Sequence, residues 1–136
     1  MPCLGMSFYL KNAVLNAALH GTPFTLPSRL FLAAFVSAPS DIGGAEPGSP
    51  YGQQPSSTYG YQRMPVTFGP VTGGTAASTS NVSFPLAAHD WGGVAGFGIY
   101  DDGGNLLFYG LAPSPLPVIA GDLIGCNAGD ISVALS

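Results

Sequence analysis

The sequence predicts a mainly β protein: an antiparallel β-sandwich of the jelly-roll kind with one short N-terminal α-helix. About seven short apolar segments with strand character follow one another at turn-rich spacing, and one segment near the N-terminus has helical signals. The length of 136 residues fits one domain, residues 1–136. An immunoglobulin arrangement is disfavoured, because Trp91 is the only tryptophan and Cys3 precedes the helix.

The helix is predicted over residues 7–20. Ser7 has the side chain of a helix N-cap, and Gly21 and Pro23 lie where a helix ends. The polar residues of this segment form one narrow stripe: Asn12, Asn16 and His20. The apolar residues occupy two sides, with Leu10, Val14, Ala17 and Ala18 on one and Phe8, Leu15 and Leu19 on the other. Such a helix is either sunk in a single core or packed on its own domain and against a neighbouring subunit.

Strand signals begin after the helix. Residues 29–37 form a continuous apolar run between Pro27 and Pro39, which indicates a buried strand. Apolar and polar residues alternate over 63–68, which predicts a strand with one solvent-facing side, and Pro65 favours a sheet edge.

Five more strands are expected further along the chain. The alternation repeats over 82–86, and the runs 94–100 and 105–111 flank Asp101, Asp102, Gly103 and Gly104. An Asp-Gly step between two apolar runs is a strong hairpin signal. A last pair of strands is predicted around Val118 and over residues 131–135.

The segment 38–60 is rich in proline and glycine and contains almost no aliphatic residue. Loops longer than about 15 residues without secondary structure are uncommon and are usually functional or mobile. Two interpretations stay open: a flexible insertion, which we favour, or an arm that becomes ordered against a partner. The large contact groups of this region are Tyr51, Tyr59 and Tyr61.

The composition excludes several classes of partner. Three basic residues stand against seven acidic ones, and charged residues make up 7% of the chain, whereas an ordinary soluble domain has about 25%. Nucleic-acid binding needs clustered Lys and Arg, so we expect no nucleic-acid partner. No apolar stretch approaches the length of a membrane span and no secretory signal is visible, so we expect synthesis in a cytoplasm and no membrane partner.

The sequence offers no catalytic constellation. His89 and Asp90 are neighbours along a strand and therefore face opposite sides, and no GxSxG motif presents a serine nucleophile. Asp101 and Asp102 are explained as turn residues. The glycines Gly96 and Gly98 resemble a dinucleotide fingerprint, but Asp101 stands where the third glycine would be and no helix follows. We therefore expect no enzyme.

Metal and cofactor sites are also not expected. Cys3 and Cys126 lie near opposite ends of the chain and form neither a zinc spacing nor a CxxC motif. Either a disulfide or two free thiols fits this pair, and we favour free thiols. The DDGGN segment does not fit the EF-hand spacing. The chain is accordingly predicted to contain no resident metal and no cofactor.

A resemblance to a protein family rests on several segments: MSFYLKNAVLNAAL from Met6, RLFLAAFVSAPSD, YQRMPVTFGP, SNVSFPLAAHDWGGVAGFGIYDD, GGNLLFYGLA and VIAGDLI. Together they resemble a group of small structural proteins of tailed bacteriophages. Members are commonly labelled tail fibre protein, and some are similar to the jelly-roll cement or decoration proteins of phage capsids. The similarity extends from about Met6 to Leu135. The chain differs from the family pattern in the proline- and glycine-rich insertion at 43–60.

The resemblance implies a non-enzymatic virion protein, and low charge fits subunits packed at high density. We expect a homo-oligomeric cement protein on the capsid exterior, whose partner is the major capsid protein and which bridges neighbouring capsid subunits. The alternative is a tail or tail-fibre component that serves as an adaptor or binds a host receptor. The residues expected at the partner interface are Phe8, Leu10, Val14, Leu15, Leu19, Tyr51, Tyr59 and Tyr61.

Overall fold

The computed structural model describes residues 3–24, 27–40, 42–47 and 59–134. One α-helix, α1 (Phe8–Leu19), lies between the first two strands of this described part. The strands are β1 (Cys3–Met6), β2 (Leu30–Phe35), β3 (Met64–Val66), β4 (Thr75–Ala77), β5 (Val82–Ser83), β6 (Gly92–Asp101), β7 (Leu106–Val118), β8 (Gly125–Cys126) and β9 (Ser132–Ala134). The predicted mainly β class with one N-terminal helix is confirmed.

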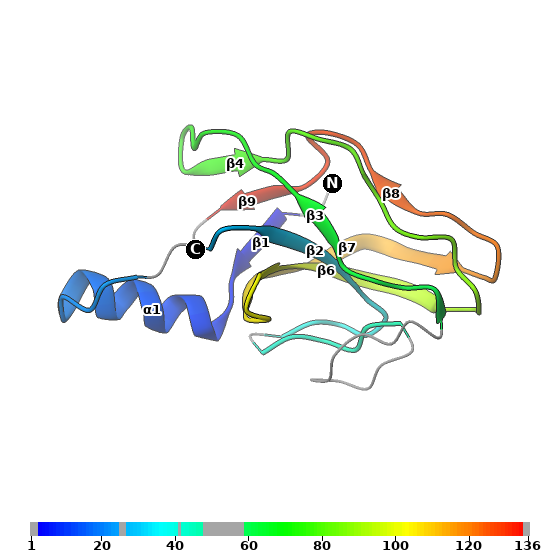
Figure 1. The fold of residues 1–136 in the computed structure, drawn as a ribbon, viewed down its shortest axis with the longest axis horizontal. Helices are drawn as coiled ribbons and strands as arrows, with labels where there is room; N and C mark the ends of the chain where they lie inside the picture. Colours follow the sequence, from blue (N-terminus) through cyan, green and yellow to red (C-terminus); the bar gives the residue numbers. More distant parts are fainter. Residues whose placement is uncertain (1–2, 25–26, 41, 48–58, 135–136) are drawn as a thin grey trace.

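Most of the described strands belong to one curled sheet (Figure 1). Its order is β3-β2-β6-β7-β1-β9-β4, and β5 and β8 form a separate two-stranded sheet. The neighbours pair antiparallel except β1 and β9, which run parallel. The N-terminal strand β1 therefore lies inside the sheet, between β7 and β9, which the sequence did not predict.

The strongest strand predictions are confirmed. Residues 29–37 contain β2, whose last four residues are buried. The strand β3 contains Pro65 and lies at the edge of the sheet, as a proline without an N–H donor requires. The predicted hairpin is formed by β6 and β7.

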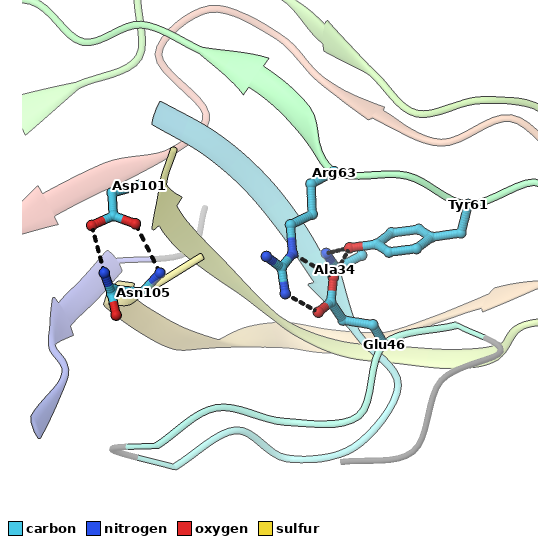
Figure 2. A network of polar contacts seen from close by, with 6 residues as sticks. All are labelled: Ala34, Glu46, Tyr61, Arg63, Asp101 and Asn105. Atoms are coloured by element: carbon cyan, nitrogen blue, oxygen red, sulfur yellow. Dashed lines mark hydrogen bonds and ion pairs between the residues drawn. The ribbon is translucent and has the colours of Figure 1, made fainter. Parts of the chain in front are cut away.

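The turn of this hairpin is built on Asp101. One oxygen of its carboxylate accepts hydrogen bonds from the backbone N–H groups of Gly103 and Asn105, and the other accepts one from the Asn105 side chain. Figure 2 shows the two contacts with Asn105. Gly104 has a φ of 85°, a left-handed angle that favours glycine. Asp102 accepts a hydrogen bond from the Ser28 hydroxyl. The geometric role predicted for this turn agrees with these contacts.

The main core contains an aromatic cluster. The rings of Tyr61 and Phe84 stack with centroids 5.8 Å apart, and Trp91 meets Tyr61 edge-on at 5.5 Å. Leu32 and Ala34 of β2 point into this core, whereas Ala33 and Phe35 point to the opposite face of the sheet and pack with Tyr100 and Leu106. The strand β2 therefore separates two apolar clusters.

Residues 42–47 lie against the second cluster. A Cβ added to Gly44 would lie 3.1 Å from the Phe35 ring, and Val36 donates a backbone hydrogen bond to the carbonyl of Ala45. Glu46 and Pro47 are buried. The expectation of a flexible insertion is thus wrong for 42–47, because this part packs on the sheet. Residues 48–58, which include Tyr51, lie outside the described part of the chain.

Candidate functional site

The base of α1 is fixed to β7. The Ser7 side chain caps the helix by accepting a hydrogen bond from the Leu10 N–H at 3.2 Å, and its hydroxyl donates to the Leu106 carbonyl. The Ser7 N–H donates to the Leu107 carbonyl at 2.8 Å. Ser7 is buried, so a single residue links the helix start rigidly to the sheet.

Beyond its first turn the helix projects from one end of the sheet (Figure 1). Leu10 is the buried residue of α1, and it packs toward the body. The exposed fraction is 56% for Phe8, 55% for Leu15 and 81% for Leu19. Large apolar side chains gathered on an exposed element mark an interaction surface. Four predicted interface residues, Phe8, Val14, Leu15 and Leu19, are therefore accessible, whereas the prediction for Leu10 is wrong because this side chain is buried.

A groove runs between α1 and the chain that returns from it. It is lined on the helix side by residues such as Tyr9, Asn12 and Asn16 and on the other side by Thr22, Pro23 and Phe24. The Thr22 N–H donates to the Asn16 carbonyl at 3.1 Å, which holds the return segment against the last turns. The groove has amide side chains and no ionisable acid or base apart from the Tyr9 phenol.

A second, apolar groove of about 410 Å³ is lined by residues from several strands of the sheet. Its lining comes from β2, β4, β6, β7, β9 and the chain between β3 and β4: Leu30, Phe68, Gly69, Val71, Gly74, Ala76, Ile99, Phe108 and Val133. None of these residues is titratable or nucleophilic. This groove can hold apolar groups but offers nothing for acid, base or covalent catalysis.

The polar centre of the molecule is a network around Glu46 (Figure 2). Arg63 binds the Glu46 carboxylate with two nitrogens, at 2.7 and 3.1 Å, and the Tyr61 hydroxyl donates to the same carboxylate at 2.6 Å. The Tyr61 oxygen also accepts from the Ala34 N–H at 3.0 Å. The guanidinium of Arg63 lies 3.6 Å from the centre of the Tyr100 ring. No buried side-chain nitrogen or oxygen of the described residues, this network included, lacks a hydrogen-bond partner.

The electrostatics of this network follow from its burial. Burial first, and the neighbouring Glu46 second, raise the pKa of Tyr61 well above its ordinary value. Burial alone would lower the pKa of Arg63, but the hydrogen bond and the charge of Glu46 outweigh it and raise that pKa. Arg63 therefore stays charged and Tyr61 stays neutral, which suits a structural ion pair rather than proton transfer.

The tyrosines expected at the partner interface take other positions. Tyr61 is 1% exposed and belongs to the core, so its prediction as an interface residue is wrong. Tyr59 is half-buried, its ring lies 5.1 Å from that of His89, and its carbonyl accepts a hydrogen bond from the Trp91 indole. The positions of Tyr59 and Tyr61 could not be predicted from the sequence, because burial depends on contacts with residues far along the chain.

Titratable residues elsewhere in the described part are dispersed. No group of three or more His, Cys, Asp or Glu side chains comes together there. The Asp90 carboxylate accepts a hydrogen bond from the Ala120 N–H, which joins two loops. Cys126 is a free thiol, and burial, with a smaller effect of Asp130, raises its pKa to about 11, so it is protonated at neutral pH.

Sequence reasoning missed the ion pair between Glu46, which is buried, and Arg63, which is half-buried. Glu46 is the only glutamate of the chain and follows a Gly-Gly-Ala stretch in the proline-rich segment, a context that indicates solvent exposure. Its partner lies 17 residues away, beyond any local spacing rule. The one available signal was that Arg63, one of only three basic residues in the chain, is the first residue of the strand predicted over 63–68.

Comparison with known proteins identifies the class. A protein-family model described as podophage GP4 fiber I protein gp80 matches residues 5–134. The match covers nearly the whole chain, and the chain belongs to this family of phage fibre proteins. The predicted class, a structural protein of a bacteriophage virion, is thereby confirmed. A search of curated proteins gave no match. No helix of the described residues is both long and apolar enough to cross a membrane.

Proposed function

We propose that this chain is a non-enzymatic structural subunit of a phage tail fibre. The observation that carries the proposal is the family match over residues 5–134, because the matched family is described as a fibre protein. The structure supports a role in assembly: a curled sheet holds a projecting helix whose apolar side chains are exposed. In this role the chain joins neighbouring subunits and contributes rigid contact surface rather than chemistry.

The polar side chains support a structural role in the same way. The carboxylates of Glu46, Asp90 and Asp101 each bind partners within the fold. The apolar groove lined by strands of the sheet has no titratable residue in its lining. An enzyme needs convergent polar groups beside a pocket, and the lining of this groove supplies none. The side chains that the sequence offered as catalytic candidates therefore serve the fold.

The capsid-cement role is the alternative that has to be separated from the fibre role. A cement protein would bind the major capsid protein around the whole shell, so that its copy number would be comparable to that of the shell protein. A fibre subunit is present in few copies, at the tail. Location and copy number therefore discriminate the two roles directly.

The experiment is gold labelling of purified virions with an antibody against this chain, combined with quantitative mass spectrometry. The fibre role predicts label at the tail and a copy number far below that of the major capsid protein. Label over the whole shell with hundreds of copies would show the cement role instead. Absence of the chain from purified virions would overturn both roles. Lysate from cells infected by a phage that lacks the gene is the control for the antibody.

A further inference from the structure

The curl of the main sheet brings its two edge strands together (Figure 1). These edges are β3 and β4, the first and last strands of the order given above. Just beyond their ends, Phe68 and Ser78 form a β-bridge, and the Gly69 N–H donates to the Ala77 carbonyl at 3.0 Å. The sheet therefore closes on itself at this point, in the manner of a barrel.

The apolar groove lies on the core side of this sheet. Ile99 of its lining is a buried member of the main core, and Leu30, Phe108 and Val133 are half-buried and pack against that core. Small-molecule sites measure roughly 300–1,000 Å³, are lined mainly by apolar side chains and often lie in the mouths of β-barrels. The groove, with a volume of about 410 Å³, matches such a site in size, lining and position.

A third groove, of about 440 Å³, adjoins the apolar one and contains a positive charge. The two grooves share Leu30 and Phe68, and the third one includes Arg29, so we name it the Arg29 groove. The Arg29 side chain is exposed, and its guanidinium lies 5.2 Å from the centre of the Phe31 ring. The nearby Ser28 hydroxyl donates to Asp102, so its proton is already used within the fold.

The charge of Arg29 determines which polar end a ligand of this site has. The other two basic residues of the chain lie elsewhere: Arg63 pairs with Glu46, and Lys11 belongs to α1. In a chain with a net charge of −4, a guanidinium at the border of an apolar groove attracts an anion locally. The guanidinium presents its donors in a planar fork that fits a carboxylate.

We propose that the apolar groove binds the alkyl chain of a fatty acid, whose carboxylate lies at Arg29. The side chains of the groove lining offer no hydrogen-bond donor or acceptor. A peptide segment would bring backbone N–H and C=O groups that these side chains cannot bind, whereas an alkyl chain brings no polar group. The border at Leu30 and Phe68 connects the place of the alkyl chain with that of the carboxylate. This site goes beyond the fibre role and does not depend on it.

The test is isothermal titration calorimetry of the full chain with straight-chain fatty acid salts below their micelle concentrations. Each buried methylene corresponds to about a fourfold lower dissociation constant. Octanoate, decanoate and dodecanoate are therefore expected to bind as one molecule per chain, with affinity that rises along the series until the groove is full. No binding of dodecanoate overturns the proposal, and so does binding of many molecules to one chain.

A first pair of variants locates the alkyl chain. Val71 lines the groove and is 70% exposed, so Val71→Asp brings a charge to the groove without burying it in the core. Leu123 is 64% exposed and lines neither groove, so Leu123→Asp is the matched control. Val71→Asp is expected to weaken dodecanoate binding about tenfold, while Leu123→Asp binds as wild type does. Equal affinities of the two variants overturn the assignment to the groove.

A second pair locates the carboxylate. Arg29→Gln is expected to weaken dodecanoate binding about fivefold, the effect of losing a solvent-exposed ion pair. Lys11→Gln removes a charge on α1, outside both grooves, and is expected to leave the affinity unchanged. An unchanged affinity in Arg29→Gln overturns the assigned position of the carboxylate. Circular dichroism of each variant confirms that its β structure is retained.

Flotation with phosphatidylcholine vesicles separates a free fatty acid from a lipid surface as the occupant. Wild type is expected to stay in the soluble fraction. Flotation of the chain with the vesicles, without dodecanoate binding in calorimetry, would assign the groove to a membrane and overturn the proposal. None of these results changes the location of the chain on the virion, so failure of this proposal and failure of the fibre role are distinguished.

Discussion

Arg63 and Glu46 form an ion pair in which Nη2 of Arg63 lies 2.7 Å from Oε1 of Glu46. The Glu46 side chain is 2% exposed and that of Arg63 15%. The pair joins the proline-rich segment to the chain just before β3, and the Arg63 guanidinium also covers the Tyr100 ring of β6. Three separate stretches of sequence are thus held by one charge pair.

Removal of one partner of this pair is expected to destabilise the fold strongly. Arg63→Ala leaves the Glu46 carboxylate buried without its counter-charge, which typically lowers the free energy of unfolding by about 3 to 5 kcal/mol. Urea denaturation measures the change. Arg29→Ala is the control, because Arg29 is exposed and lies over the Phe31 ring at 5.2 Å without a buried partner charge in the described contacts. Similar losses in the two variants would contradict the role assigned to the pair.

The Tyr61 hydroxyl bridges Glu46 and the Ala34 N–H, so Tyr61→Phe leaves two buried groups with one partner fewer. The expected loss is about 1 to 3 kcal/mol in the free energy of unfolding at neutral pH. A tyrosine-to-phenylalanine change at Tyr9, which is exposed on α1, is the matched control. A neutral effect at Tyr61 would show that the bridge contributes nothing.

The raised pKa of Tyr61 predicts that the folded protein loses stability at alkaline pH. Burial raises its pKa above the ordinary value of 10.0, so the folded chain holds the phenol proton more tightly than the unfolded chain. The stabilisation linked to this proton is fully present below pH 10 and is lost as the pH rises above it. The difference in stability between wild type and Tyr61→Phe should therefore be constant from pH 8 to about 10 and become smaller between pH 10 and 11. A constant difference across this range would contradict the linkage.

Gly98 is expected to tolerate no side chain. A Cβ at this position would lie 2.7 Å from a Phe35 ring carbon and 3.0 Å from Leu106. Gly98→Ala should lower the free energy of unfolding by about 1 to 3 kcal/mol, because the ring must shift in a packed cluster. Gly93→Ala on the same strand meets only an ordinary contact at 3.6 Å and should be nearly neutral. Thermal unfolding of the two variants measures the difference.

The two neighbouring aspartates of the β6–β7 turn, Asp101 and Asp102, have different roles. Asp101→Ala removes the acceptor of three hydrogen bonds and is expected to cost about 1 to 3 kcal/mol. Asp102→Asn keeps an oxygen that can accept from the Ser28 hydroxyl and should be close to neutral. Chemical denaturation of both variants tests this order, and a larger effect at Asp102 would reverse the assignment of the two carboxylates.

The parts of the fold that the sequence predicts are those with local signals. Capping and apolar periodicity define α1, alternation and Pro65 define the edge strand, and the Asp-Gly turn defines the β6–β7 hairpin. The strand β1 escapes prediction because it pairs with β7, more than a hundred residues later, and has no alternation of its own. The left-handed glycine of the hairpin turn is Gly104 and not Gly103, a choice of turn geometry that composition does not specify.

For the candidate site, too, the sequence predicts the features with local signals but not those that depend on tertiary contacts. The sequence predicts that α1 has apolar residues on two sides, but it cannot state that Leu10 faces the sheet while Leu15 and Leu19 remain exposed. It also assigns Tyr61 to a partner, because a tyrosine beside a proline-rich loop looks accessible until Phe84 and Trp91 are brought against it. Periodicity shows which sides of an element are apolar, whereas tertiary contacts decide which of these sides is buried.

The placement of α1 between β1 and β2 has a mechanical consequence. Both strands are interior to the sheet: β1 is bonded to β7 and β9, and β2 to β3 and β6. A pull on the helix is therefore transmitted to strands held on both sides, and their interstrand hydrogen bonds, which run across the strand direction, share a load along it. Because the helix joins two interior strands, tension along these strands acts on bonds to neighbours on both sides and does not peel an edge strand from the sheet.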